Sequence, residues 1–547
     1  MEVKKKPEEI FREYERGVQY NQRIGEDGLY EAVERYENFY IGRHWEGVNA
    51  PEMEKPVLNF THRVISYLIS MLVADDIGVS LTPFRKNSRR EAMCKVLSRE
   101  TERVIERSRL KTEAREALRG CAVDGDTAIY FYLDGDRKTG EAARGEIACE
   151  IVENTKVLFG NPFESRVERQ PYLLIVRRRL IEEARRVAEE DGRSREETQR
   201  IRPDGESRYG EDDQDDRLVT CIVKLWKENG TVRWLETCRE TVIQKERDTG
   251  YRRYPVAWMS WEAVRSSYHG HSAMEGMIPN QIFVNKLWAM MMIQVKNAAF
   301  PKIFYNRSII KKWTNRVGDA VGIEGSPDTD MRNIAQSLRA GDFSVQAMEL
   351  VEKTISYTKD YMGANDVALG DVRPENTSAI IAVQKASSAP LELQRLAYFQ
   401  LMEDCVRIML EIMRCDYGVR TVTVDQETAQ ALGLLDNWPP EMAAPDSLDL
   451  QLDFSGMDLD EMELNVDVGT SSYWSEITQQ QSADNLLKAG ILQDAADYVE
   501  RIPDKWVKDK AGLLKKLKER QQQLQTARQQ TPQEQLGLNP MESGGML

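Results

Sequence analysis

Residues 279–300 read PNQIFVNKLWAMMMIQVKNAAF and place large apolar side chains on nearly every face of a predicted helix. Pro279 suits the first turn, where its missing N–H would have no intrahelical partner. A helix without a polar face must be covered on every side, and the segments that flank this one are short and charged. We therefore expect neighbouring copies of the chain to cover it. The residues expected at that contact are Ile282, Leu287, Trp288, Met291 and Val295.

The sequence of this helix allows two other interpretations. A membrane span needs about 20 apolar residues, and Asn285, Lys286, Gln294 and Lys296 interrupt the run, so no membrane association is expected. An ordinary buried helix in the core of a monomer stays open as an alternative.

Composition limits the class of protein. A chain of 547 residues is longer than the roughly 250–300 residues at which single cores stop growing, so we expect two or more structural regions. A net charge of -15 argues against a protein whose whole surface grips phosphate backbones, although it permits a local basic patch. Seven dispersed cysteines without a C-x-x-C pair favour a reducing compartment. The charged N-terminus lacks the apolar stretch of a signal peptide.

The segments before this helix predict an α+β region. Helices are expected over residues 28–41, ending at Gly42, within 59–76 and over 88–119, and strands at 77–84 and in six segments from 128 to 246 where apolar residues alternate. The charged stretch 182–217 predicts a solvated helix followed by a loop. The Gln-rich end, 521–547, predicts a disordered tail. The chain as a whole is expected to be α+β and mainly helical.

The usual enzyme motifs are missing from the sequence. It contains no phosphate-binding G-x-x-x-x-G-K-[ST], no G-x-G-x-x-G after a strand, no H-E-x-x-H and no G-x-S-x-G. His269 and His271 could ligate a metal from one side of a strand, but the favoured interpretation is a turn around Gly270. Asp124 and Asp126 are interpreted as turn residues before a strand. We expect no catalytic residues, no metal and no cofactor.

The segment after the apolar helix forms a local basic patch on an acidic protein. Aromatic Tyr305 and Trp313 are interleaved with the cations, as in many nucleic-acid grooves. The alternative is a small β-rich subdomain whose cations keep it soluble or bind an acidic protein. The cations of the patch are Lys302, Arg307, Lys311, Lys312 and Arg316.

Two helices and a loop follow the basic segment. A helix is expected from about 343 to 363, a loop over 364–376 between helix breakers, and a long helix over 377–415 that Pro390 either kinks or restarts. The loop carries both charges and amides and is expected to project from its two helices. Its candidate functional residues are Asn365, Asp366, Asp371, Arg373, Glu375 and Asn376.

The order of these segments resembles the portal proteins of tailed bacteriophages and prophages, the head-to-tail connectors. The resemblance covers most of the chain and rests on four stretches in sequence order. They are FYIGRHWEG with NFTHRVISYLISMLV, YHGHSAMEGMIPNQIFVNKLWAMM, GANDVALGDVRPENTSAIIAVQKASSAPLE and VDVGTSSYWSEITQQQSADNLLKAGIL.

The resemblance implies a division of the chain into portal regions. These are an N-terminal wing (1–271), a first stem helix (272–299), a clip (300–341), a second stem helix (342–363), a tunnel loop (364–376), a long wing helix with return strands (377–475), a helical crown (476–520) and the tail (521–547).

The resemblance also implies a function without enzymatic activity. A ring, expected to be a dodecamer, would sit at one capsid vertex of the virion and conduct double-stranded DNA during terminase-driven packaging and during ejection. The implied partners are the terminase large subunit, the head-tail adaptor, and the capsid and scaffolding proteins, with assembly in the cytoplasm of the host bacterium. Two alternatives remain open from the residues alone. One is an acidic metal-dependent hydrolase or nuclease that uses the carboxylates of 124–136 with His269 and His271, and the other is a nucleic-acid-binding scaffold that forms no ring.

Overall fold

The computed structural model divides the chain into two units, residues 1–468 and 469–547. It is 49% helical and 24% strand, which confirms the predicted α+β class with helix as the larger share. The described residues are 5–51, 53–73, 77–85, 87–137, 145–204, 218–299, 302–312, 334–338, 345–364, 389–433 and 447–468, with 498–499, 512–514 and 516–517 in the second unit.

An antiparallel five-stranded sheet has the order β4-β5-β6-β7-β8. Four of these strands were predicted from their alternating apolar residues. Helix α1 (Pro7–Asn21) packs on the sheet through Ile10 and Phe11, a helix that the charged N-terminal sequence did not reveal. The strands are β4 (Val157–Phe159), β5 (Tyr172–Leu180), β6 (Leu218–Glu228), β7 (Thr231–Thr237) and β8 (Val242–Asp248). Helices α6 (Ile181–Glu190) and α7 (Arg195–Gln199) follow β5.

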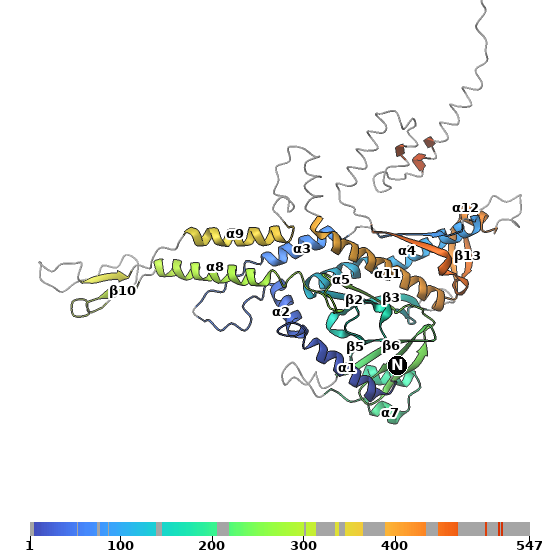
Figure 1. The fold of residues 1–547 in the computed structure, drawn as a ribbon, viewed down its shortest axis with the longest axis horizontal. Helices are drawn as coiled ribbons and strands as arrows, with labels where there is room; N and C mark the ends of the chain where they lie inside the picture. Colours follow the sequence, from blue (N-terminus) through green and yellow to red (C-terminus); the bar gives the residue numbers. More distant parts are fainter. Residues whose placement is uncertain are drawn as a thin grey trace, which may run out of the picture. The chain divides into compact units, whose positions relative to one another are not determined.

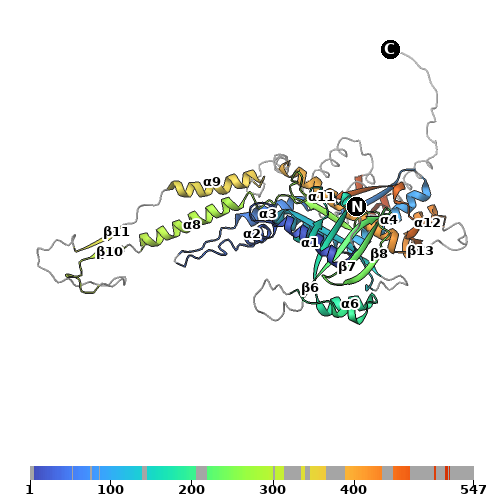
Figure 2. The same cartoon turned by 60° about the horizontal axis from the view of Figure 1, so that its bottom comes forward.

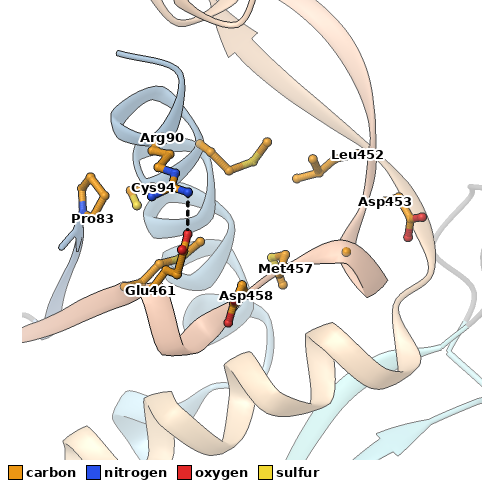
Figure 3. Close-up of a pocket in the computed structure, with 11 residues that line it drawn as sticks. Pro83, Arg90, Cys94, Leu452, Asp453, Met457, Asp458 and Glu461 are labelled. Atoms are coloured by element: carbon orange, nitrogen blue, oxygen red, sulfur yellow. Dashed lines mark ion pairs between the residues drawn. The ribbon is translucent and has the colours of Figure 1, made fainter. Parts of the chain in front are cut away.

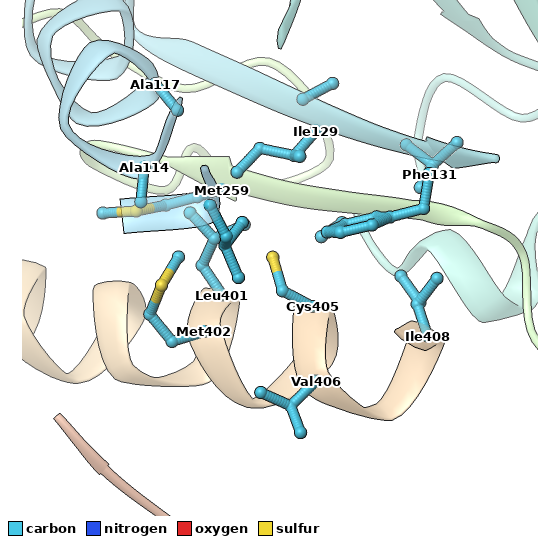
Figure 4. Close-up of a cluster of buried hydrophobic side chains, with 14 of the residues drawn as sticks. Ala114, Ala117, Ile129, Phe131, Met259, Leu401, Met402, Cys405, Val406 and Ile408 are labelled. Atoms are coloured by element: carbon cyan, nitrogen blue, oxygen red, sulfur yellow. The ribbon is translucent and has the colours of Figure 1, made fainter. Parts of the chain in front are cut away.

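A second sheet, β3-β2-β9, forms the centre of the first unit. Its strands are β2 (Asp126–Asp134), β3 (Glu146–Glu153) and β9 (Val256–Ser260). Ile129 and Phe131 of β2 gather with Leu401 of helix α11 (Glu392–Asp416) in the main core (Figure 4). Tyr130, between them, accepts a hydrogen bond from the Trp234 indole of β7. The alternation of side chains along β2 therefore joins α11 to the five-stranded sheet.

The predicted helix over 88–119 is two helices, α4 (Ser88–Arg107) and α5 (Leu110–Asp124). The break lies at Arg109, whose φ of 57° is left-handed. No Gly or Pro occurs at this position of the sequence to indicate a break in the helix. The break is explained by tertiary packing, since Ala114 and Ala117 of α5 lie against the core (Figure 4). The single-helix prediction was wrong.

Other predicted elements are confirmed. Helix α2 (Leu29–Ile41) ends at Gly42, which adopts a left-handed conformation with a φ of 91°, and α3 (Phe60–Leu72) begins after Asn59, whose side chain accepts from the His62 N–H. Strand β1 (Ile77–Pro83) matches the strand predicted at 77–84. Elements without a predicted position are β14 (Met462–Val468), which pairs with β1, and β12 (Val419–Asp425), which pairs with β13 (Ser447–Asp453) beside α12 (Gln426–Ala431). Short 3-10 helices are η1 (Asn154–Lys156), η2 (Val167–Arg169), η5 (Ala389–Leu391), η6 (Phe454–Gly456) and η7 (Leu459–Glu461).

Two helices of the first unit, α8 (Ile278–Ala299) and α9 (Val345–Tyr361), lie side by side (Figures 1 and 2). Helix α8 confirms the predicted apolar helix and has Pro279 in its first turn. Strands β10 (Lys302–Tyr305) and β11 (Ala335–Leu338) form an antiparallel pair, and α9 returns the chain. None of the described helices meets the length and hydropathy needed to cross a bilayer.

Candidate functional site

Helices α8 and α9 form an antiparallel pair. Near the start of α8, Asn280 donates a hydrogen bond of 2.9 Å to the Thr358 hydroxyl near the end of α9. Farther along, Val284 of α8 and Val351 of α9 are buried in one apolar cluster with Phe60 of α3. The inner face of the pair is therefore packed within the chain and anchored to α3.

The outer faces of the same two helices expose large apolar side chains. Val295 is 68% exposed and Tyr361 is 83% exposed, values usual for charged surface residues rather than for Val and Tyr. The exposed set comprises Phe283, Met290, Met292 and Val295 on α8, and Met348, Leu350, Tyr357 and Tyr361 on α9. Large apolar side chains exposed in this number on two neighbouring helices are candidates for an interaction site. We call these eight residues the outer stripe.

The five residues predicted at a contact between subunits divide between the two faces. Leu287 and Met291 pack against the apolar cluster that contains Val351 of α9, and Ile282 packs against the main core. Trp288 is half-buried, whereas Val295 is exposed. The chain thus covers more of α8 than its sequence suggested. The aromatic residues of α9 in the outer stripe were missed because charged residues interrupt the apolar pattern of the helix, namely Glu349, Glu352, Lys353, Lys359 and Asp360.

The basic segment lies on the β10–β11 pair and the turn that follows β10. Arg307, Lys311 and Lys312 are exposed there beside Phe304, which is 63% exposed. The backbone of Lys302 starts β10, whereas its side chain, like Trp313 and Arg316, lies outside the described residues. The β-rich character of this segment agrees with the subdomain alternative, and its exposed aromatic and cationic side chains keep the nucleic-acid alternative open.

The predicted loop 364–376 lies outside the described residues except for Ala364, which is buried. This applies to Asn365, Asp366, Asp371, Arg373, Glu375 and Asn376. The long helix predicted over 377–415 is described from Glu392 as α11, after the 3-10 turn η5 that contains Pro390. Pro390 therefore lies directly before the described helix, and residues 377–388 of the predicted helix lie outside the described residues.

His269 and His271 do not form a shared site. The His269 ring is buried, with Nδ1 2.9 Å from the Asp126 carboxylate and Nε2 3.2 Å from Asn21 Oδ1. The side chain of His271 is 56% exposed and contacts Glu275 at 2.6 Å. Asp126 also accepts the Gly270 N–H at 2.8 Å. This arrangement fixes the turn before α8, in agreement with the structural interpretation of both residues.

Asp124 ends α5 in a partly buried position beside the paired Glu37 and Arg119, which are 2.5 Å apart. Burial, followed by the Glu37 charge, raises the pKa of Asp124 to about 7. Its Oδ1 has no hydrogen-bond partner among the described residues, although its backbone carbonyl accepts from Asn154 at 3.0 Å. No group of three or more His, Cys, Asp or Glu that could hold a metal occurs in the described part of the chain.

A cavity of about 240 Å³ lies between α4 and the segment from β13 to β14 (Figure 3). Its polar side chains already have partners: Arg90 pairs with Glu461 at 2.8 Å, and Asp453 and Asp458 accept backbone N–H groups in their own turns. The rest of the lining is mainly apolar, namely Pro83, Met93, Cys94, Leu452, Met457 and Met462, with Gly456.

Comparisons with known proteins give no relative: no family model and no curated protein matches the chain. The outer stripe and the basic β10–β11 segment are therefore interpreted from the geometry of this chain alone, and they are its two candidate functional surfaces.

Proposed function

We propose that this chain is the subunit of a portal ring, set at one vertex of a phage capsid and serving as a conduit for double-stranded DNA. The observation that carries the proposal is the α8–α9 pair, which is packed on its inner face and exposes the eight apolar side chains of the outer stripe. In a closed ring each subunit meets two neighbours through two different surfaces. The α8 and α9 parts of the outer stripe supply two such surfaces on adjacent helices.

The order of elements supports the same proposal. An α+β region precedes α8, the β10–β11 pair lies between α8 and α9, and α11 follows. In the portal scheme these are the wing, the two stem helices with the clip between them, and the wing helix. Residues 364–376 would be the tunnel loop, and residues 476–520 would be the crown.

The charge distribution also suits a conduit. Each phosphate contact would make movement of DNA a salt-sensitive unbinding event, so a channel should not grip its cargo. The net charge of -15 fits this requirement. Arg307, Lys311 and Lys312 are exposed on the segment beside β10, where they would offer a basic surface to the terminase large subunit during packaging and to the head-tail adaptor afterwards. Capsid and scaffolding proteins would contact the wing.

Negative-stain imaging and native mass measurement of the full chain test the proposal. We expect closed rings with a central hole. The double variant Met290→Asp, Val295→Asp should stay folded but remain monomeric, because it places two charges in the outer stripe. Phe84→Asp, at a residue 65% exposed outside the stripe, is the control and should still form rings. A wild-type chain that stays monomeric at micromolar concentration, with α8 protected from hydrogen exchange, would refute the proposal.

A further inference from the structure

A series of buried hydrogen bonds joins the first half of α8 to the α2–α3 region. Gln281 accepts the Phe60 N–H at 3.2 Å through Oε1 and donates through Nε2 to the Leu58 carbonyl at 2.7 Å. The same Nε2 donates to Asn285 Oδ1 at 3.0 Å. Gln281 is 0% and Asn285 is 3% exposed, so water cannot replace these bonds without opening the interface.

The series of hydrogen bonds continues from Asn285 to a histidine, His44. Asn285 Nδ2 lies 2.8 Å from His44 Nδ1, and His44 Nε2 lies 2.9 Å from the Phe39 carbonyl oxygen. His44 is buried, and its ring stacks on the Phe39 ring at 4.9 Å between centroids. We call Gln281, Asn285 and His44 the polar relay.

Backbone groups at both ends fix the direction of every bond in the polar relay. The Phe60 N–H can only donate and the Leu58 carbonyl can only accept, which sets the amide of Gln281 and then that of Asn285. Asn285 must therefore donate to His44 Nδ1. At the other end, the Phe39 carbonyl requires a hydrogen on His44 Nε2. The imidazole in this arrangement is neutral, with Nδ1 as an acceptor.

A second proton on His44 has no acceptor in this arrangement. An N–H on Nδ1 would face the N–H of Asn285, so protonation must break that bond and leave an unpaired charge in a buried site. The surroundings agree, because burial lowers the pKa of His44 against the opposing effect of its bonds to Phe39 and Asn285.

The charged groups on the surrounding elements do not offset this cost. The described neighbours with ionisable side chains are exposed, and none is among the causes that shift the pKa of His44. They are Arg43 and Glu46 after α2, His62 and Arg63 on α3, and Lys286 on α8.

We propose that the polar relay is an acid-sensitive latch, which holds the first half of α8 against α2 and α3 at neutral pH and releases it when His44 takes up a proton. The proposal goes beyond the conduit function and does not depend on ring formation, because every residue of the polar relay lies in one chain. In a portal ring, the latch would govern the attachment of the first stem helix to the wing.

The difference between the pKa of His44 in the closed state and in the open state sets how strongly the opening of the latch depends on pH. The ordinary pKa of histidine is about 6.5, and this is the value expected once the latch is open. Because the pKa is lower in the closed state, the closed state is fully favoured above about 6.5 and loses stability as the pH falls through that value. The opening equilibrium should rise by about tenfold for each pH unit below 6.5, until the pKa of the closed state is reached.

Hydrogen exchange of the α8 amides 281–289 in the full chain tests the latch at pH 7.5 and pH 5.0, after correction for the intrinsic exchange rate. The wild type should lose protection at pH 5.0 relative to pH 7.5, because the pKa of His44 is lower in the closed state than in the open one. In His44→Phe, Asn285→Leu, two apolar side chains replace the histidine of the polar relay and its hydrogen-bond partner, so the protection of α8 should be equal at both pH values. If circular dichroism reveals that this variant is unfolded, His44→Phe alone provides the same test.

His271→Gln is the matched control, because it removes an exposed imidazole and should leave the pH response of α8 unchanged. Asp124 also titrates near pH 7, but its protonation favours the folded state and cannot mimic the release. Unchanged protection of wild-type α8 at pH 5.0, or a pH response that persists without His44, would overturn the proposal. Neither result bears on whether the chain forms a ring.

Discussion

The Lys224 ammonium donates a hydrogen bond of 2.6 Å to the Glu13 carboxylate, and both side chains are buried. This ion pair joins the middle of α1 to the centre of the five-stranded sheet. The ammonium also lies 4.7 Å from the Tyr172 ring centroid, and burial followed by the Glu13 charge raises the pKa of Tyr172 to about 12. The N-terminal helix is thus held by one buried charge pair as well as by apolar contacts.

Glu13→Gln should destabilise the chain by about 3–5 kcal/mol, because it leaves the buried ammonium without its carboxylate. Urea unfolding monitored by circular dichroism measures the change. The double variant Glu13→Leu, Lys224→Met is the control and should be near neutral or more stable, since apolar residues of similar volume often replace buried ion pairs without loss. A single variant as stable as the wild type would contradict the buried pairing.

The contact between Lys224 and Glu13 could not be predicted from the sequence. Alternating apolar residues located β5 to β8, and an apolar run opened by Pro279 located α8, because local periodicity reports which side chains are buried. The pattern of alternating residues predicts an exposed side chain at Lys224. Its burial depends on the ion pair with Glu13, which lies 211 residues earlier. Long-range pairing of this kind leaves no local signal.

The candidate site was predictable in part for the same reason. The apolar surface of α8 was visible in the sequence, but the share of it covered by α9 depends on a tertiary contact between Val284 and Val351. Asn285 was visible only as a polar interruption of the apolar run, and Gln281 lies one turn before it. Their spacing of four residues on an apolar helix places them on one face, which is the signal that could have located the polar relay.

Leu401→Ala should cost about 2–5 kcal/mol, because Leu401 is 1% exposed in the core between α11 and β2 and its truncation leaves a cavity. Leu393 on the same helix is 76% exposed, so Leu393→Ala should change stability by less than about 0.5 kcal/mol. Thermal unfolding of the two variants compares them. Equal losses would mean that the described face of α11 is not the one that packs.

Two helical glycines should respond to alanine with opposite signs. A Cβ on Gly17 of α1 would lie 2.8 Å from Leu158 Cδ1 and 3.1 Å from Leu158 Cβ, so Gly17→Ala should push α1 off the sheet at a cost of about 1–3 kcal/mol. A Cβ on Gly120 of α5 would meet only Asp124 Oδ2, at 4.0 Å. Gly120→Ala should therefore stabilise the chain by about 0.5–1 kcal/mol through helix propensity. Chemical denaturation distinguishes the two, and a stabilised Gly17→Ala would contradict the packing of α1 on β4.

Asp124 should make the chain less stable above neutral pH. Its pKa is raised from 3.8 to about 7, first by burial and then by the Glu37 charge. The stability that this raised pKa confers is full below pH 3.8 and is lost as the pH rises through 7. Asp124→Asn removes the ionisation while keeping the shape of the side chain. It should match the wild type near pH 4 and exceed it by about 1–3 kcal/mol at pH 8.5, a range reduced from the full shift because the residue is partly exposed. Glu37→Gln should recover a smaller part of that gain, since it removes only the second cause. Urea titrations at the two pH values measure both effects. If the stability of Asp124→Asn depends on pH in the same way as that of the wild type, the ionisation of a buried carboxylate at this position is contradicted.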